Sequence, residues 1–244
     1  MDIKLALMAG VDIPIPELQA IIHQPQLIEI ARMGEQNFFM AIHYLCLNKE
    51  ALLEDESLLQ SLTNFQVLMK VIEQSEDAEK KIALITLLSL LFPGFKPIIT
   101  PKSIILNNLQ TKQSILIDDN NYVFLQEILK QMFCISSIFQ GDNVVYNPAN
   151  EAAKKIADKL MKGRKRVAEL KGKNQESVLS RYVSILTIGI SSMSLENCLA
   201  LTIYQLFDLV ERYNLFIEWD LNLRIKLAGG DPKQDAENWM KNIH

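Results

Sequence analysis

The sequence predicts a mainly α-helical fold with a small β element. Apolar residues recur at three- and four-residue intervals through most of the chain after residue 27, which is the periodicity of an amphipathic helix. Two short regions break that pattern with β-branched residues and prolines, one near the N-terminus and one around residues 98–117. We therefore expect short strands in those two regions and a helical C-terminal half.

Length and composition predict a globular chain with a sizeable core. The sequence has 244 residues, of which 49% are hydrophobic, and this suffices for one large domain or two small ones. The longest apolar run, Ile82 to Phe92, is about half of what a bilayer crossing requires, so we expect no membrane association. Asp2 and the lack of a basic start argue against a secretory signal.

The cysteines predict a reducing compartment. Cys46, Cys134 and Cys198 lie far apart, each in an apolar helical stretch. An odd number of cysteines without paired spacing favours buried free thiols over disulfides. We therefore expect a cytoplasmic protein.

The N-terminal part, residues 1–117, should combine helices with short strands. Prolines at positions 14 and 16 predict that residues 3–22 form an edge strand or an extended arm rather than a helix. Runs of isoleucine between residues 98 and 117 predict two or three short strands. Helices are expected at residues 27–47 with a bend at Gly34, at 50–64, at 65–73, and from a cap at Ser75 to a stop at 91–94. The last of these is so apolar that we expect it to be fully buried.

The C-terminal part, residues 118–244, is predicted to be helical, although the two parts together could also form one continuous domain. Helices are expected at residues 122–139 with a cap at Asp118–Asn121, at 148–173, at 175–188, at 203–228, and in a short segment after Asp231. The helix at 203–228 has the clearest limits, because Thr202 and Gln205 form a capping box and Gly229 and Gly230 follow its end. Phe216 and Trp219 are among the residues that widen its apolar face beyond what one neighbour would cover, so we expect it to pack on more than one side.

The predicted helix at 148–173 contains the strongest charge contrast in the chain. Between Glu151 and Lys173 there are nine cationic residues and three anionic ones, which gives this segment a charge of +6 within a chain of net charge −4. Five of the cations repeat at helical spacing and should line one side: Lys154, Lys155, Lys159, Lys162 and Arg166. Such a stripe can bind phosphates, but it has no aromatic residues for stacking on bases. The favoured interpretation is a solvated helix whose charge balances the acidic rest of the chain or meets an acidic partner.

The sequence gives no signature of catalysis. It contains no phosphate loop, dinucleotide-binding glycine motif, zincin helix or nucleophile elbow. Its three histidines share no metal-ligand spacing with one another or with the cysteines. Asp118 and Asp119 are expected to cap the helix that follows rather than to bind a metal. We therefore expect no enzyme, no cofactor and no metal.

The two tryptophans are the best candidates for aromatic contacts with a partner. Both lie in the last 26 residues of the chain, and aromatic anchors are typical of binding surfaces. Trp219 is interpreted as a core residue of the long helix. Trp239, with the adjacent Met240, is predicted to contribute a partner-binding patch near the C-terminus.

Several segments together resemble proteins of tailed phages and prophages of Gram-positive bacteria. In the C-terminal part these segments are Ser184–Gly189, Leu201–Leu209, Glu211–Tyr213, Trp219–Asp220, Lys226–Gly230 and Asn238–His244. Earlier in the chain they are Ile13–Pro16, Gln26–Ala31, Gly34–Glu35 and Ile117–Cys134. The similarity covers most of the chain, but these segments are packing motifs and not a catalytic signature.

The proteins of this group resemble tail assembly chaperones, which are mostly helical proteins that coat the tape-measure protein until tail-tube subunits displace it. The resemblance implies a reversible, non-enzymatic role in the host cell cytoplasm, with the tape-measure protein or another tail protein as partner. The basic stripe would steer the partner electrostatically. Three alternatives stay open: a tail or baseplate component of the virion, a nucleic-acid-binding protein that uses residues 151–173, and an enzyme with an unrecognised site. With any of these functions the protein could form a homo-oligomer.

Overall fold

The structure is a computed structural model that describes residues 2–52, 61–74, 78–135, 177–231 and 239–240. The helices are α1 (Ile3–Ala9), the 3-10 helix η1 (Pro16–Leu18), α2 (Leu27–Met33), α3 (Glu35–Leu45), α4 (Lys49–Leu52), α6 (Asn64–Gln74), α7 (Ala78–Leu91), α8 (Tyr122–Met132), α11 (Val178–Gly189), α12 (Leu195–Leu199) and α13 (Ile203–Leu227). The strands are β1 (Ile13–Ile15), β2 (Ala20–Ile22), β3 (Phe95–Ile99), β4 (Ile104–Asn108) and β5 (Ser114–Ile117). This confirms the predicted class, which is mainly α with short strands in the two expected regions.

The chain begins with a helix that the sequence analysis did not predict. The Asp2 side chain caps α1 by accepting a hydrogen bond from the backbone N–H of Leu5 at 3.3 Å, and Gly10 ends the helix in a left-handed conformation with φ of 65°. The prediction of an extended arm over residues 3–22 is therefore wrong for its first third. The prolines act only after Gly10, where β1 and β2 form an antiparallel hairpin around η1.

The segment after the hairpin confirms the predicted bend. Helices α2 and α3 meet at Gly34, whose φ of 91° is available to glycine and costly for other residues. Helix α3 packs against α7, and both contribute to one hydrophobic core that includes residues from α1 through α13. Much of the predicted helix at 50–64 lies outside the described residues, as does the predicted cap at Ser75.

Helix α7 ends ahead of Pro93 and Gly94 as predicted, but it is not fully buried. Leu84, Leu87 and Leu88 are inaccessible, whereas Ile82 is 61% exposed. The helix packs on α3, β3 and α2. The side that carries Ile82 and Ile85 is apolar but exposed, and its composition misled the prediction.

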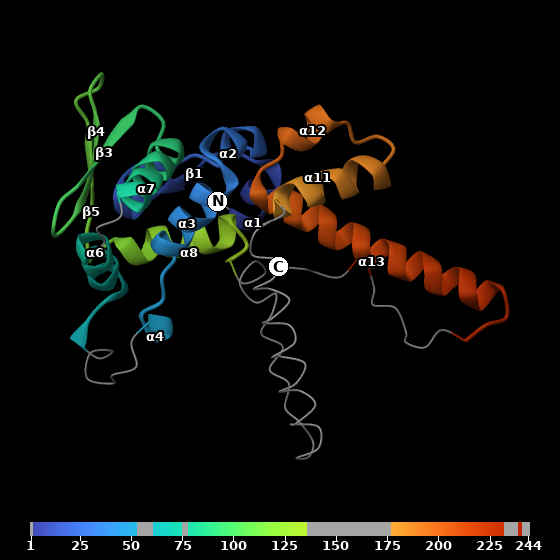
Figure 1. Cartoon of the computed structure of the whole chain (residues 1–244). Helices are drawn as coiled ribbons and strands as arrows, with labels where there is room; N and C mark the ends of the chain where they lie inside the picture. The colour runs from blue at the N-terminus through green and yellow to red at the C-terminus, as the bar shows by residue number, and fades with distance from the viewer. Residues whose placement is uncertain (1, 53–60, 75–77, 136–176, 232–238, 241–244) are drawn as a thin grey trace, which may run out of the picture.

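The second sheet has the strand order β3-β4-β5, with both pairings antiparallel. Side chains alternate across it, so that Leu106 and Ile115, which are register partners, face the core. Their neighbours Ile105 and Leu116 lie on the outer side. Figure 1 shows this sheet at the end of the molecule that is remote from α13.

Helix α8 is shorter than predicted. It ends at Met132, and Cys134 follows with φ of 49°, a conformation that interrupts the helix well before residue 139. At its start the N-cap is Asn121, which makes no side-chain cap bond. The N-cap thus lies within the predicted stretch Asp118–Asn121, but the prediction that the carboxylates of Asp118 and Asp119 cap the helix is wrong.

These two aspartates form other contacts. The Asp118 carboxylate accepts a hydrogen bond from the backbone N–H of Asn120 at 2.9 Å. The Asp119 carboxylate accepts hydrogen bonds from the Thr63 hydroxyl and from the Gln66 amide, the latter at 3.1 Å. Asp119 thus fixes the start of α6 to the start of α8.

The C-terminal helices attach to the N-terminal part through polar contacts at helix ends. The Glu35 carboxylate, at the first residue of α3, accepts hydrogen bonds from the backbone N–H groups of Val178 at 2.8 Å and Leu179 at 3.2 Å, and from the Ser177 hydroxyl. A carboxylate at this position accepts hydrogen bonds from N–H groups of α11 that have no partner within the helix. Its negative charge also interacts favourably with the positive end of the helix dipole. The N–H of Leu27 also donates to the carbonyl of Leu201 at 2.8 Å. Helices α11 and α13 are thereby joined to α2 and α3.

Two predicted helices lie outside the described residues, namely the basic helix at 148–173 and the short helix after Asp231. The predicted division of the chain at residue 117 stays a prediction. Among the residues that the structure describes, no helix is long and apolar enough to cross a membrane.

Candidate functional site

Helix α13 has two halves that differ sharply in exposure. In the first half Ile203, Leu206 and Val210 are at most 6% exposed. In the second half Ile217 is 45% exposed and Leu221 is 56% exposed. Figure 1 shows α11 alongside the first half, whereas the second half extends past α11 and away from the body of the molecule.

The first half of α13 is held on several sides, as the sequence analysis predicted for the helix as a whole. Thr202 and Gln205 form the predicted capping box. The Gln205 amide also donates to the carbonyl of Met8 at 2.8 Å, which ties α13 to α1. The rings of Phe207 and Tyr182 meet at 5.4 Å, which ties it to α11. These contacts fix the direction in which the second half projects.

Three aromatic rings gather on one side of the second half. The ring centroids of Phe216 and Trp239 lie 5.6 Å apart in an edge-to-face arrangement, and those of Trp219 and Trp239 lie 6.4 Å apart. Phe216 and Trp219 are 41% and 37% exposed, and the neighbouring Met240 is 67% exposed. We call Phe216, Trp219, Trp239 and Met240 the aromatic cluster.

The aromatic cluster corrects one prediction about the tryptophans. Trp219 is not a core residue, because it lies on the part of α13 that projects beyond the body. The prediction placed it inside because Trp219 is one of the apolar residues that widen the apolar face of the helix. Spacing shows that a face is apolar, but it does not show which part of that face another element covers.

The predicted basic residues cannot be placed relative to this cluster. Lys154, Lys155, Lys159, Lys162 and Arg166 all lie outside the described residues. Trp239 and Met240 are described, and the Trp239 ring lies next to Phe216, which the sequence analysis counted only as a residue that widens the apolar face. Its position three residues before Trp219 was the available signal, since residues at this spacing share a helix face.

The charges on the second half of α13 balance. Glu218 and Asp220 are followed by Arg224 and Lys226, and Arg224 Nε lies 2.8 Å from the Asp220 carboxylate. Two acidic and two basic residues give this part of the helix no net charge. The surface therefore fits an apolar partner better than a polyanion.

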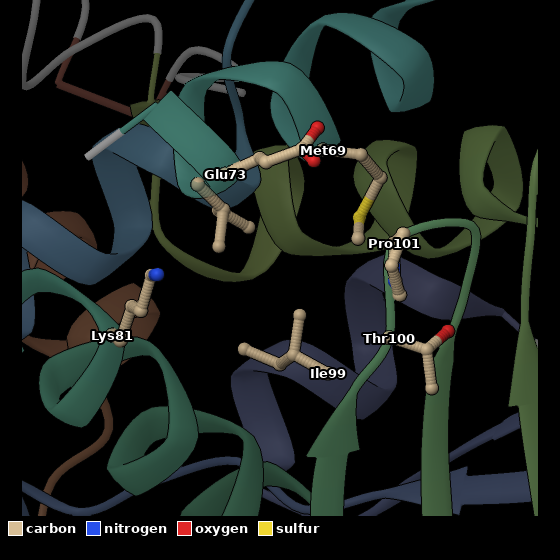
Figure 2. A pocket seen from close by; sticks show the side chains of 7 residues that line it. Met69, Glu73, Lys81, Ile99, Thr100 and Pro101 are labelled. Atoms are coloured by element: carbon tan, nitrogen blue, oxygen red, sulfur yellow. The ribbon is translucent and has the colours of Figure 1, made fainter. Parts of the chain in front are cut away.

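A small pocket lies elsewhere, between α6, α7 and the turn from β3 to β4. Its volume is about 190 Å³, which is below the usual range for drug-sized ligands. Figure 2 shows Met69 and Ile99 facing the space, with Lys81 and Pro101 on opposite sides of it. The lining is mostly apolar and offers Glu73 and Lys81 as its charged groups.

The cysteines are buried free thiols, as predicted. Burial raises the pKa of Cys46 and of Cys134 to about 12, and it also raises the pKa of Cys198. A thiol with such a pKa is protonated at neutral pH and is a poor nucleophile. Within the described ranges, no group of three or more His, Cys, Asp or Glu side chains is placed to hold a metal ion.

Comparison with known proteins gives one match. Residues 171–244 match the family model described as YomV second domain. The family name comes from a protein of a Bacillus prophage. This part of the chain is similar to a phage-associated domain. The matched range contains α11, α12, α13 and all four residues of the aromatic cluster. No curated protein and no solved structure matches the chain.

Proposed function

We propose that this protein is a non-enzymatic phage tail morphogenesis protein that acts as a chaperone for the tape-measure protein in the host cytoplasm. The observation that carries the proposal is the aromatic cluster, which is exposed on a projecting helix. The phage-associated family match over residues 171–244 and the resemblance to tail assembly chaperones supply the biological setting.

The chemistry of the cluster favours a helical protein partner. Phe216, Trp219 and Met240 present a large apolar area. The two aromatic side chains lose little conformational entropy on binding, and tryptophan is enriched among the residues that dominate binding energy. An amphipathic helix can lay its apolar side against such a surface, with anchors at three- and four-residue spacing. A tape-measure protein offers many such segments along one chain.

The basic segment has a secondary part in this proposal. Lys154, Lys155, Lys159, Lys162 and Arg166 would attract acidic segments of the client and raise the association rate. Their contribution would decrease with increasing salt, since screening acts on exposed charges. The apolar contact at the aromatic cluster would persist at high salt.

Co-expression with the tape-measure protein of the same genome tests the proposal. After nuclease treatment, size-exclusion chromatography with light scattering should give a soluble complex with several copies per client. Phe216→Ser should lower the apparent affinity for the client at least tenfold and thereby reduce the number of bound copies. Phe124→Ser is the matched control, because Phe124 on α8 is 39% exposed and lies outside the cluster.

The alternatives give different outcomes in the same experiment. If the protein elutes alone, the chaperone proposal is wrong. If a large species forms but collapses on nuclease treatment, the basic segment binds nucleic acid instead. If purified phage particles retain the chain in fixed copy number, it is a structural tail or baseplate component.

A further inference from the structure

A second apolar surface runs along α13 on the side away from the aromatic cluster. Ile217, Leu221 and Ile225 repeat at four-residue steps, with Ala228 one turn further on. We call these four residues the aliphatic stripe. At about 100° per residue, the centre of this stripe lies roughly 170° around the helix from the centre of Phe216, Trp219 and Leu223. The two surfaces are therefore on opposite sides.

The aliphatic stripe continues a face that is already used for packing. Ile203, Leu206 and Val210 lie on the same side of the helix and are buried in the core. Beyond them Ile217 and Leu221 keep the same orientation but are about half exposed. Apart from Asn214 this face is apolar along the helix, and other elements cover its first half. This arrangement indicates a second packing partner for the other half.

The charges beside the stripe indicate what that partner is. Asp220 and Arg224 lie next to one another along one edge of the stripe, four residues apart. In an antiparallel pair of identical helices, equivalent edges meet with their order reversed. A two-fold axis near residue 222 places Asp220 of each copy beside Arg224 of the other. The same axis places Leu221 of both copies near the centre of the contact. It places Ile217 of each copy over the turn that carries Ile225 and Ala228 in the other.

From this self-complementarity we propose that the protein forms an antiparallel homodimer through the aliphatic stripes of two α13 helices. The contact over residues 214–228 extends for about four turns, or roughly 22 Å. Such a contact is at the low end for specific interfaces, so the dimer dissociates in roughly the micromolar range. The pairing leaves both aromatic clusters facing outward, so the dimer contact does not depend on the proposed function.

The dimer would also explain how a repetitive client is held. Two aromatic clusters on one particle bind two segments of the same chain, and the second binding event is then intramolecular. A dimer would therefore coat a long helical client more tightly than a monomer with the same individual contacts.

Sedimentation equilibrium of the full chain at increasing concentration tests the dimer. The wild-type protein should change from monomer to dimer mass, and Leu221→Ser should raise the dissociation constant at least tenfold. Leu195→Ser is the matched control, because Leu195 is 59% exposed, close to the 56% of Leu221, but lies on α12. A wild-type protein that is still monomeric at several hundred micromolar would overturn the proposal.

Charge variants distinguish contacts between helices from contacts within one. Asp220→Arg gives each copy two cations on this edge, and Arg224→Asp gives each copy two anions. Each variant alone should be monomeric, whereas an equimolar mixture should form a heterodimer. Circular dichroism should show wild-type helicity in both, since these side chains lie on the exposed half of α13. If the mixture stays monomeric while the wild type dimerises, the antiparallel register is wrong.

Discussion

The two halves of α13 have the same apolar periodicity and opposite surroundings. Leu206 in the first half is inaccessible, and Leu221 in the second half is 56% exposed. The first half is enclosed by contacts with α1, α8 and α11. One helix is thus a core element at one end and an exposed apolar surface at the other, without a change in sequence pattern.

The largest expected effect is the difference in unfolding free energy between a leucine-to-alanine substitution in the first half of α13 and one in the second half. Leu206→Ala should lower the free energy of unfolding by about 2–5 kcal/mol, because it leaves a cavity in the core. Leu221→Ala should change it by less than about 0.5 kcal/mol in the monomer. Urea denaturation at low protein concentration measures both. Equal losses would contradict the difference between the halves.

The junction between the halves gives the next largest effect. A Cβ atom on Gly189 of α11 would lie 2.3 Å from the ring of Tyr213, so the two helices approach closely at this point. Gly189→Ala should therefore cost about 1–3 kcal/mol through overpacking.

A double-mutant cycle separates this clash from other effects of the substitution. In a Tyr213→Ala background the alanine at position 189 should cost almost nothing, because the ring is gone. If the cost persists in that background, the close approach is not its cause.

The attachment of α11 depends on one carboxylate. Glu35→Gln removes the negative charge that faces the N–H groups of Val178 and Leu179, and we expect a loss of about 1–2 kcal/mol. Glu17→Gln is the control, because Glu17 is an exposed glutamate on η1. Hydrogen exchange should show faster exchange at the start of α11 in the Glu35 variant only.

The smallest effect is a pH dependence remote from α13. The two ring nitrogens of His23 lie 2.9 Å from the Asp12 carboxylate and 3.1 Å from the Glu29 carboxylate. Burial lowers the pKa of His23, but hydrogen bonds and charge interactions with Glu29 and Asp12 outweigh it and raise the pKa above 6.5. Protonated His23 therefore stabilises the fold below pH 6.5, and this contribution is lost as the pH rises through the folded-state pKa.

A His23→Gln variant isolates that contribution. Because the ring is partly exposed, the stabilisation should be at most about 1 kcal/mol. The free-energy difference between wild type and variant should be larger at pH 6 than at pH 8. A difference that grows toward pH 8 would contradict the assignment of a charged imidazole.

The sequence predicted those features that depend on neighbouring residues. The capping box of Thr202 and Gln205, the bend at Gly34 and the short strands around residues 98–117 all involve short separations, and all three are present. Helix α1 is a local feature that it missed, although Asp2 caps it and Gly10 ends it. Other missed features depend on distant residues. Glu35 meets the start of α11 more than 140 positions later, and Asp119 meets Thr63 and Gln66.

The candidate site was predicted only in part for the same reason. Trp239 and Met240 were identified as a contact patch, but Phe216 and Trp219 were assigned to packing. Helical spacing distinguishes apolar sides from polar sides, and it carries no information on where the neighbouring helix ends. The end of α11 at Gly189 determines which part of α13 is left exposed.

We propose that the second half of α13 binds a helical client through its aromatic cluster. The chain has two tryptophans, and both belong to that cluster, so intrinsic tryptophan fluorescence reports on this surface alone. Titration with the tape-measure protein should shift the emission to shorter wavelength and reduce quenching by acrylamide, whereas dimerisation through the aliphatic stripe should leave both unchanged. A complex that forms by light scattering without any change in tryptophan emission or quenching would contradict the claim.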